Sequence, residues 1–141
     1  MKVALVTGGA TGIGAATVEA LATENIAVAI QYSSSSNEAK ALSDKLKSAG
    51  KKVEIFQSDL TKAGAAESLV SQVKSSLGVI DILINNAGIG SLTTVEKESD
   101  ENWHKVLNVN VVGTARVSRS AIPLLRTSKS AAIVNTASIA G

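Results

Sequence analysis

The chain has 141 residues and a net charge of +2, and 45% of its residues are hydrophobic while 18% are charged. The length fits about one domain, and the composition excludes a disordered or low-complexity protein. Because 14 basic residues stand against 12 acidic ones, the charge gives little reason to expect nucleic acid or a membrane as a partner. The chain has no cysteine and a single histidine, His104, which excludes disulfides, thiolate catalysis, a cysteine or histidine metal site and a Ser-His-Asp triad.

Short apolar segments alternate along the chain with segments of helical periodicity. Five segments read as strands, at 3–7, 27–32, 53–57, 81–85 and 131–135. Several are apolar at consecutive positions, which is typical of strands buried on both faces of a parallel sheet. Four helices are expected between them, with the apolar stripes Ile13, Ala16, Ala20 and Leu21; Ala39, Leu42, Leu46 and Ala49; Ala66, Leu69, Val70, Val73 and Leu77; and Trp103, Val106, Leu107, Val117, Ala121 and Leu124. The alternation predicts an α/β fold with a doubly wound, open parallel sheet.

Glycine or polar clusters follow every predicted strand. They are Gly8–Gly14, Ser33–Ser36, Asp59, Asn85–Gly88 and Ser138. Loops are polar in most proteins, so a single cluster would say little. Open parallel sheets, however, bind ligands beyond the carboxyl ends of their strands, and five clusters at this one edge favour a single cofactor crevice.

The first cluster, Thr7–Gly14, reads T-G-G-A-T-G-I-G and runs from a strand directly into a helix. Glycines in such a turn let the backbone approach a pyrophosphate, which then sits at the helix N-terminus. The spacing is neither G-x-G-x-x-G nor G-x-x-x-x-G-K-[ST], and the absence of a lysine in the loop argues against a nucleotide triphosphatase.

Asn110 is the one conspicuous polar residue away from this edge. It lies three residues beyond Leu107 and seven beyond Trp103, so it shares their apolar helical face, on a helix whose start Ser99 is placed to cap. Such a residue is either a satisfied core asparagine that braces a neighbouring strand or a functional one that organises a water or a catalytic side chain.

Taken together, these motifs resemble the classical short-chain dehydrogenase/reductase family. T-G-x-x-x-G-x-G at Thr7–Gly14 and N-N-A-G at Asn85–Gly88 carry the resemblance. Asp59-Leu60, the N-V-N-V-V-G-T stretch at Asn108–Thr114 and the V-N-T-A-S run ending at Ser138 strengthen it. The chain looks most like 3-oxoacyl-carrier-protein reductases and their sugar-alcohol or xenobiotic relatives. The resemblance implies an NAD(P)-binding Rossmann domain over residues 1–141.

The same resemblance implies roles for individual residues. Pyrophosphate binding would fall to the glycine loop, adenine binding to Asp59 with Leu60 beside it, and ribose binding to the N-N-A-G segment. The full set of implied cofactor-binding residues is Gly8, Thr11, Gly12, Ile13, Gly14, Ser33, Ser34, Asp59, Leu60, Asn86, Ala87 and Gly88. Ser138 would polarise the substrate carbonyl and Asn110 would hold a water in a proton relay, so we favour the functional interpretation of Asn110.

The end of the second strand bears on the choice of cofactor. An acidic residue there usually binds the ribose 2′-hydroxyl of NAD and repels a 2′-phosphate. Here the strand ends Gln31-Tyr32-Ser33-Ser34, without an acid, and hydroxyls near the next helix N-terminus can accept a 2′-phosphate. We therefore expect NADP rather than NAD.

The family's proton donor is the tyrosine of a Y-x-x-x-K motif downstream of the serine. This chain stops three residues after Ser138, and its one tyrosine is Tyr32. We therefore expect an NADP-dependent oxidoreductase acting on a small carbonyl or alcohol, truncated before the family's C-terminal strands, inactive by itself, and a homo-oligomer at full length. The alternative is a non-catalytic dinucleotide-binding or interaction module. No apolar run approaches the roughly 18 residues of a membrane helix and Met1-Lys2-Val3 is unlike a signal peptide, so we expect a cytoplasmic protein.

Overall fold

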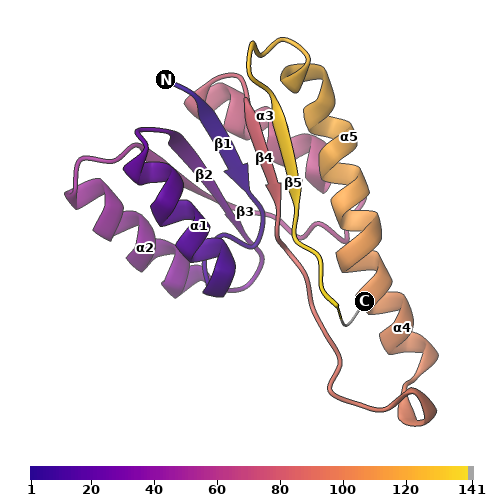
Figure 1. Ribbon diagram of the computed structural model, residues 1–141. Coiled ribbons are helices and arrows are strands. Elements are labelled where there is room, and N and C mark those ends of the chain that lie inside the picture. The colour runs from indigo at the N-terminus through magenta and orange to yellow at the C-terminus, as the bar shows by residue number, and fades with distance from the viewer. Residues whose placement is uncertain (140–141) are drawn as a thin grey trace.

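The computed structural model describes residues 1–139 as a five-stranded parallel sheet covered by helices on both faces (Figure 1). The strands are β1 Val3–Val6, β2 Ala27–Tyr32, β3 Val53–Gln57, β4 Ile82–Asn85 and β5 Ala132–Asn135. The helices are α1 Gly12–Thr23, α2 Ser36–Ser48, α3 Ala65–Leu77, a 3₁₀ turn η1 Val95–Lys97, α4 Asp100–Leu107, a π-helical segment η2 Asn108–Gly113 and α5 Thr114–Leu125. The order β3-β2-β1-β4-β5 confirms the doubly wound α/β fold predicted from the sequence.

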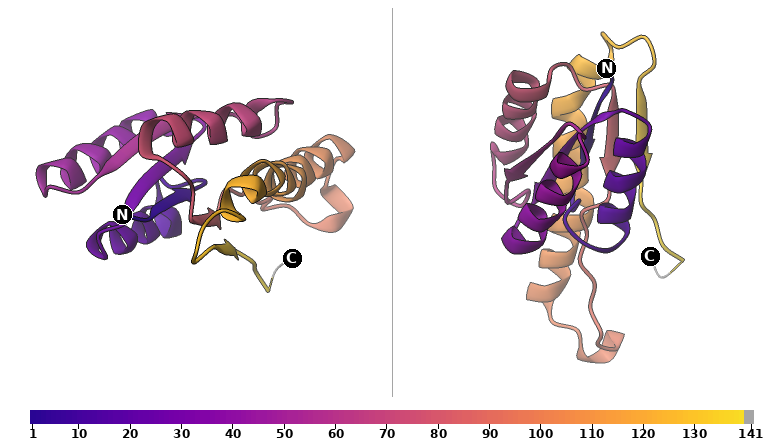
Figure 2. Two further views of the ribbon diagram at one scale, coloured as in Figure 1. Left: turned by 90° about the horizontal axis from the view of Figure 1, so that it is seen from above. Right: turned by 90° about the vertical axis from the view of Figure 1, so that its left-hand side faces the viewer.

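Two apolar layers hold the sheet in place. On one face, Val6, Val28 and Ile30 pack against Val18 of α1 and Leu42 of α2. On the other face, strand residues pack against α3 and α5 in a second cluster; it includes Leu5, Leu83, Leu69, Val73 and Val117. Figure 2 shows these helical layers on either side of the strands. After β3 the chain passes through α3 on the second face and returns to the sheet as β4 beside β1, so the strand order reverses between β1 and β4. Open parallel sheets bind ligands at such a reversal, in a crevice beyond the carboxyl ends of the strands.

The apolar stripe predicted for the first helix is wrong except at Leu21, which packs partly buried against the cluster on the α1–α2 face. Ile13 is 69% exposed, and Ala16 and Ala20 also face solvent. The buried residues of α1 are instead Gly14, Val18 and Ala22, four residues apart. The smallest side chain therefore faces the sheet where α1 approaches it most closely, and Ile13 is left at the mouth of the glycine loop.

The second and third stripes are confirmed except for Ala49, which is exposed at the end of α2. Gly50 ends α2 as its position suggests, with φ of +73°. Its N–H donates to the Lys47 carbonyl, and the Lys51 N–H donates to the Leu46 carbonyl, both at 2.9 Å. This pairing satisfies the last carbonyls of the helix.

The long fourth helix runs from Asp100 to Leu125 as α4, η2 and α5, and its middle part is π-helical. Ser99 caps α4 as predicted, its Oγ accepting from the Asn102 N–H at 3.1 Å. However, α4 buries none of its residues: Trp103 and Leu107 are each 47% exposed, and only α5 packs on the sheet. Figures 1 and 2 show α4 and the loop before it extending past the carboxyl end of the sheet. The apolar periodicity of this segment thus correctly predicted a helix. It did not predict that the α4 part of the helix would remain exposed.

β5 is an edge strand that pairs only with β4 among the described residues. Its four residues are exposed, Ile133 at 42% and Val134 at 50%. An apolar sheet edge is therefore exposed in the described part of the chain. No helix within residues 1–139 is both long and apolar enough to cross a membrane.

Candidate functional site

The glycine loop joins β1 to α1 and lies against the end of β4. Gly8 and Gly12 have φ of +61° and +53°, a conformation that L side chains rarely adopt. A Cβ on Gly8 would lie 2.9 Å from the Cα of Ala87, and a Cβ on Gly14 would lie 2.6 Å from Nδ2 of Asn86. The loop is therefore compressed between α1 and the N-N-A-G segment, with the N-terminus of α1 and the exposed side chains of Thr11 and Ile13 at its rim.

Gln31, a buried residue of β2, binds the glycine loop through its side chain. Its Oε1 accepts from the Gly8 N–H at 2.8 Å, and its Nε2 donates to the Ser58 carbonyl at 2.7 Å. Only 2% of Gln31 is exposed, so both bonds are protected from competing water. One side chain thus ties the glycine loop to the end of β3, directly before Asp59.

Thr7 ties β1 to the N-N-A-G segment. Its hydroxyl accepts from the N–H groups of Asn86 and Ala87, both at 3.0 Å. In return, Nδ2 of Asn86 donates to the Thr7 carbonyl at 3.3 Å and to the Gly8 carbonyl at 3.2 Å. These bonds fix the two loops relative to each other, and they leave Gly88 exposed beyond them.

Asn85 forms a buried polar link between β4 and β5. It pairs in register with Asn135, and its Nδ2 donates to Oδ1 of Asn135 and to Oγ of Ser118, both at 2.9 Å. Its own Oδ1 is buried, and no hydrogen-bond partner for it lies within residues 1–139. Thr136, the next residue beyond β5, donates to Oδ1 of Asn86 at 3.2 Å. The chain leading to Ser138 is therefore anchored to the end of β4.

Ser33 and Ser34 are exposed at the end of β2, just before α2 begins at Ser36. The Ser33 carbonyl accepts from Nε2 of Gln57 at 3.1 Å. Neither the strand end nor the first turn of α2 carries an acid before Glu38. Hydroxyl groups and the start of a helix therefore meet at this corner of the crevice, as the sequence indicated.

Asp59 is exposed at the end of β3, and Thr61 holds its carboxylate. Oδ1 accepts from the Thr61 hydroxyl at 2.6 Å and from the Thr61 N–H at 3.0 Å. These bonds hold the pKa of Asp59 below its ordinary value of 3.8, so their contribution to stability is complete above that value and is lost as the pH falls through the lowered pKa. The side chain of Leu60 is 93% buried in the α3–α5 core, so its place beside an adenine stays a prediction that concerns its backbone.

Asn110 lies in η2, and both the oxygen and the nitrogen of its side-chain amide are hydrogen-bonded. Oδ1 accepts from the Ile89 N–H and Nδ2 donates to the Ile89 carbonyl, both at 2.8 Å. The residue is half-buried and clamps the segment after Gly88, rather than bracing a strand from within an apolar core. Its own carbonyl accepts from the Thr114 hydroxyl at 2.8 Å.

Asn110 and Ser138 line one cavity of about 690 Å³, although they are 28 positions apart in the chain. The cavity lies between the segment following β4 and the helical surface of α4 and η2, with Ile89, Val95 and Trp103 among its apolar walls. Its lining includes Ile89, the residue directly after the N-N-A-G segment. The two residues expected to take part in catalysis are therefore brought to the same space, beside the crevice formed by the glycine loop.

Thr7, Gln31 and Arg116 also hold the site together, although the sequence assigned none of them a role. Arg116 of α5 donates from one guanidinium nitrogen to the Thr61 carbonyl at 2.8 Å and to the Leu60 carbonyl at 3.4 Å. It thereby holds the loop that presents Asp59. Polar residues at strand ends were a usable signal for Thr7 and Gln31, whereas nothing in the local sequence of Arg116 indicates its contact 55 residues away.

Replacing Arg116 by glutamine is expected to lower the free energy of unfolding by about 1–2 kcal/mol, because charge-assisted bonds to half-buried carbonyls are lost. Amide hydrogen exchange should become faster from Asp59 to Lys62. Arg119→Gln is the matched control, since Arg119 pairs with Glu67 at 3.3 Å with side chains that are 71% and 51% exposed, and its loss should cost less than about 0.5 kcal/mol. Equal effects of the two substitutions would contradict the anchoring role.

A family model described as short chain dehydrogenase matches residues 2–141 of the chain. The 3-oxoacyl-[acyl-carrier-protein] reductase FabG of Staphylococcus epidermidis is 31% identical over 140 residues, which are 99% of this chain and 57% of that protein. The short-chain dehydrogenase/reductase of Serratia marcescens has a structure that superposes with a TM-score of 0.89 at 36% identity, covering 95% of this chain and 54% of that one. A short chain dehydrogenase of Burkholderia cenocepacia, solved in complex with NADP, gives a TM-score of 0.92 at 35% identity, covering 98% and 56%. The chain spans about half the length of these relatives. Its fold, motifs and matches show that it belongs to the short chain dehydrogenase family.

Proposed function

We propose that this chain is the cofactor-binding part of an NADP-dependent oxidoreductase that interconverts a carbonyl and an alcohol. The observation that carries the proposal is the compressed contact of Gly8 and Gly14 with the N-N-A-G segment. Because only glycine fits at these two positions, no side chain of theirs fills the space in front of α1. Backbone N–H groups at the N-terminus of a helix favour binding of a pyrophosphate in such a space. When bound, the nicotinamide cofactor would supply the hydride.

Different residues around this space would bind different parts of the cofactor. Gly12, Gly14 and the first turn of α1 bind the pyrophosphate, with Thr11 and Ile13 at its rim. Asp59, whose carboxylate Thr61 keeps ionised, accepts from the adenine amino group. Asn86, Ala87 and Gly88 border the ribose, while Leu60 supports that region from the core.

NADP is proposed over NAD because Ser33 and Ser34 directly follow β2 and no acid stands between Tyr32 and Glu38, the third residue of α2. An acid at this position would repel a 2′-phosphate, whereas hydroxyls and helix N–H groups accept one. The Burkholderia relative that superposes on this chain was solved with NADP, which supports the same choice.

At the substrate end, Ser138 donates a hydrogen bond to the carbonyl oxygen and polarises it. Asn110 keeps the segment after Gly88 closed over the cavity and supports a water in the proton relay. Tyr32 is not the general acid, since it is 91% buried beside Ala10 and Ala39, beyond the opposite end of the crevice. We therefore propose that proton donation requires residues other than those at positions 1–139, and that the chain binds cofactor without turnover.

Calorimetric titration of the purified chain tests the proposal. NADPH is expected to bind more tightly than NADH, and Ser34→Asp should reduce or reverse that preference by placing an acid at the end of β2. An unchanged preference in Ser34→Asp, or binding of neither cofactor, would reject the cofactor assignment. In a parallel assay with ketones, NADPH oxidation at ordinary enzymatic rates would show that this chain already contains its proton donor.

A non-catalytic module would also bind the cofactor without turnover. We keep this second candidate because Tyr32, the one tyrosine of the chain, is buried and cannot serve as the proton donor. Turnover by the chain joined to a C-terminal segment with a Y-x-x-x-K motif would decide for the enzyme. A homo-oligomer and a cytoplasmic location are proposed from the family resemblance alone, and light scattering would test the oligomeric state.

A further inference from the structure

The cavity beside Ser138 has the size and lining of a small-molecule site. Its volume of about 690 Å³ falls within the range of roughly 300–1,000 Å³ typical of such sites. Six apolar side chains line it: Ile89, Val95, Trp103, Val106, Leu107 and Val111. Asn110 and Ser138 line the same cavity. A carbonyl compound held at Ser138 would therefore direct its substituent along an apolar surface.

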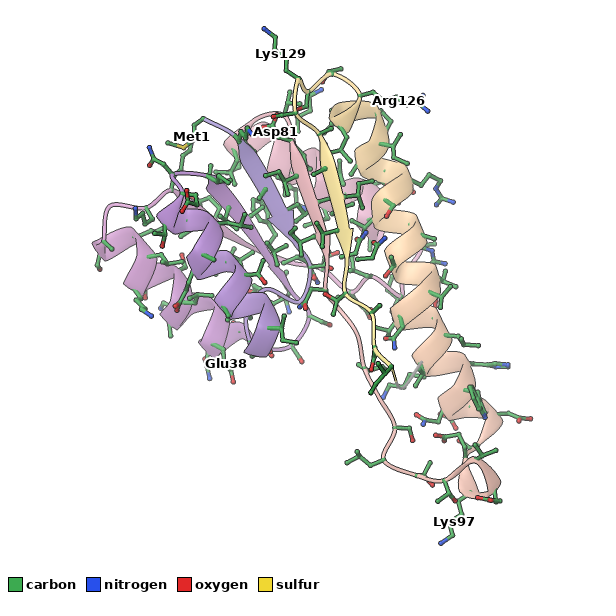
Figure 3. All side chains as sticks on the ribbon, viewed as in Figure 1. Met1, Glu38, Asp81, Lys97, Arg126 and Lys129 are labelled. Carbon is green, nitrogen blue, oxygen red and sulfur yellow. The ribbon has the colours of Figure 1, made fainter. Side chains whose placement is uncertain are left out.

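The charge of the cavity is negative. Glu98 is the one acidic residue that lines it, and within residues 1–139 no lysine, arginine or histidine does. Figure 3 shows Lys97, the neighbouring residue, pointing into solvent at the tip of the segment. No cation is therefore placed to neutralise an anion that enters.

Hydrogen bonds fix the position of Glu98. Its Oε1 accepts from Nδ2 of Asn102 at 2.8 Å and from the Ser99 N–H at 3.0 Å. Hydrogen bonds from the side chains of Ser91 and Asn102 hold the pKa of Glu98 below its usual value of 4.5, so the carboxylate is ionised at neutral pH. The residue is half-buried, unlike the exposed Glu96 two positions earlier.

We propose that this cavity selects neutral carbonyl compounds with an apolar substituent, and that the Glu98 carboxylate excludes substrates bearing a carboxylate or phosphate group. The inference rests on the proposed function, because that function makes the cavity a substrate site. The preference for uncharged ligands is a separate property that can be measured by itself. Glu98 is the specificity-determining residue, and it acts by like-charge repulsion across a partly solvated space.

The test uses two ligands that differ by one charge, methyl 2-oxooctanoate and the 2-oxooctanoate anion. Trp103 lines the cavity and is the chain's only tryptophan, so its single indole N–H resonance reports occupancy by NMR titration. The ester is expected to bind about tenfold more tightly than the anion, and the ratio should fall as salt screens the repulsion. The salt series uses the unmodified chain and does not depend on the folding of any variant.

Glu98→Gln keeps the acceptor oxygen and removes the charge, so it should raise affinity for the anion and leave that for the ester unchanged. Glu96→Gln removes the same charge two residues away, outside the cavity lining, and should leave the ratio near tenfold. Equal binding of ester and anion, a ratio that Glu98→Gln does not change, or no shift of the Trp103 signal with either ligand would overturn the inference. NADPH titration of the same samples separates the proposals, because cofactor binding without ester preference rejects only this inference, and ester preference without cofactor binding rejects only the proposed function.

Discussion

Gly14→Ala is expected to lower the free energy of unfolding by about 3 kcal/mol or more, because an added Cβ overpacks the tightest contact of the site. That Cβ would overlap the Gly8 carbonyl oxygen and lie 2.6 Å from Nδ2 of Asn86. The obstructing atoms are mostly backbone, and the Asn86 amide is itself held by two carbonyls. To accommodate a methyl group, α1 must move away from the sheet. Urea unfolding followed by circular dichroism measures the change.

Gly12→Ala is the matched control within the same loop. Nothing lies within 4 Å of a Cβ on Gly12, although its φ of +53° imposes a backbone penalty, which is about 1–2 kcal/mol for an L residue. Gly14→Ala should therefore be clearly the more destabilising change, and it should also weaken NADPH binding more. Equal destabilisation would mean that backbone conformation, and not the close approach to Asn86, sets the requirement for glycine.

The sheet was predictable because strands buried on both faces are continuously apolar, and this signal does not depend on distant contacts. The stripe of α1 was not, because its period alone cannot show that Gly14 must face the sheet. Ile13 is more hydrophobic than Gly14, so a count of apolar residues chose the wrong face. For α4, the hydrophobic residues Trp103 and Leu107 predicted a buried face. The described residues nevertheless leave both side chains about half exposed.

The candidate site was predictable where a motif is contiguous and lies at a strand end, as at Gly8–Gly14 and Asn85–Gly88. Side-chain direction was not predictable: Leu60 follows Asp59, yet one side chain enters the core and the other faces solvent. Arg116 was also beyond reach, because an arginine on a basic helix is usually solvated and its contact with the Thr61 carbonyl exists only in the folded chain. The sequence therefore predicts where the candidate site lies. The hydrogen bonds that hold its loops together, such as those of Arg116, can be identified only from the structure.

Thr7→Val is expected to destabilise the chain by about 2–4 kcal/mol, because it removes a hydroxyl that serves two backbone donors. Valine has nearly the shape of threonine, so packing is preserved at a residue that is only 2% exposed. The N–H groups of Asn86 and Ala87 would then face a methyl group where they now donate to Oγ1 at 3.0 Å. The N-N-A-G segment should loosen from β1, and affinity for NADPH should fall along with stability.

Thr7→Ser distinguishes hydrogen bonding from packing. Serine keeps the hydroxyl and loses one methyl group, so it should cost only about 1 kcal/mol and retain NADPH binding. Chemical denaturation and calorimetry of the two variants measure both effects. If serine were as damaging as valine, the methyl contact of Thr7 would be its main contribution. The hydroxyl would then not be what joins the glycine loop to the end of β4.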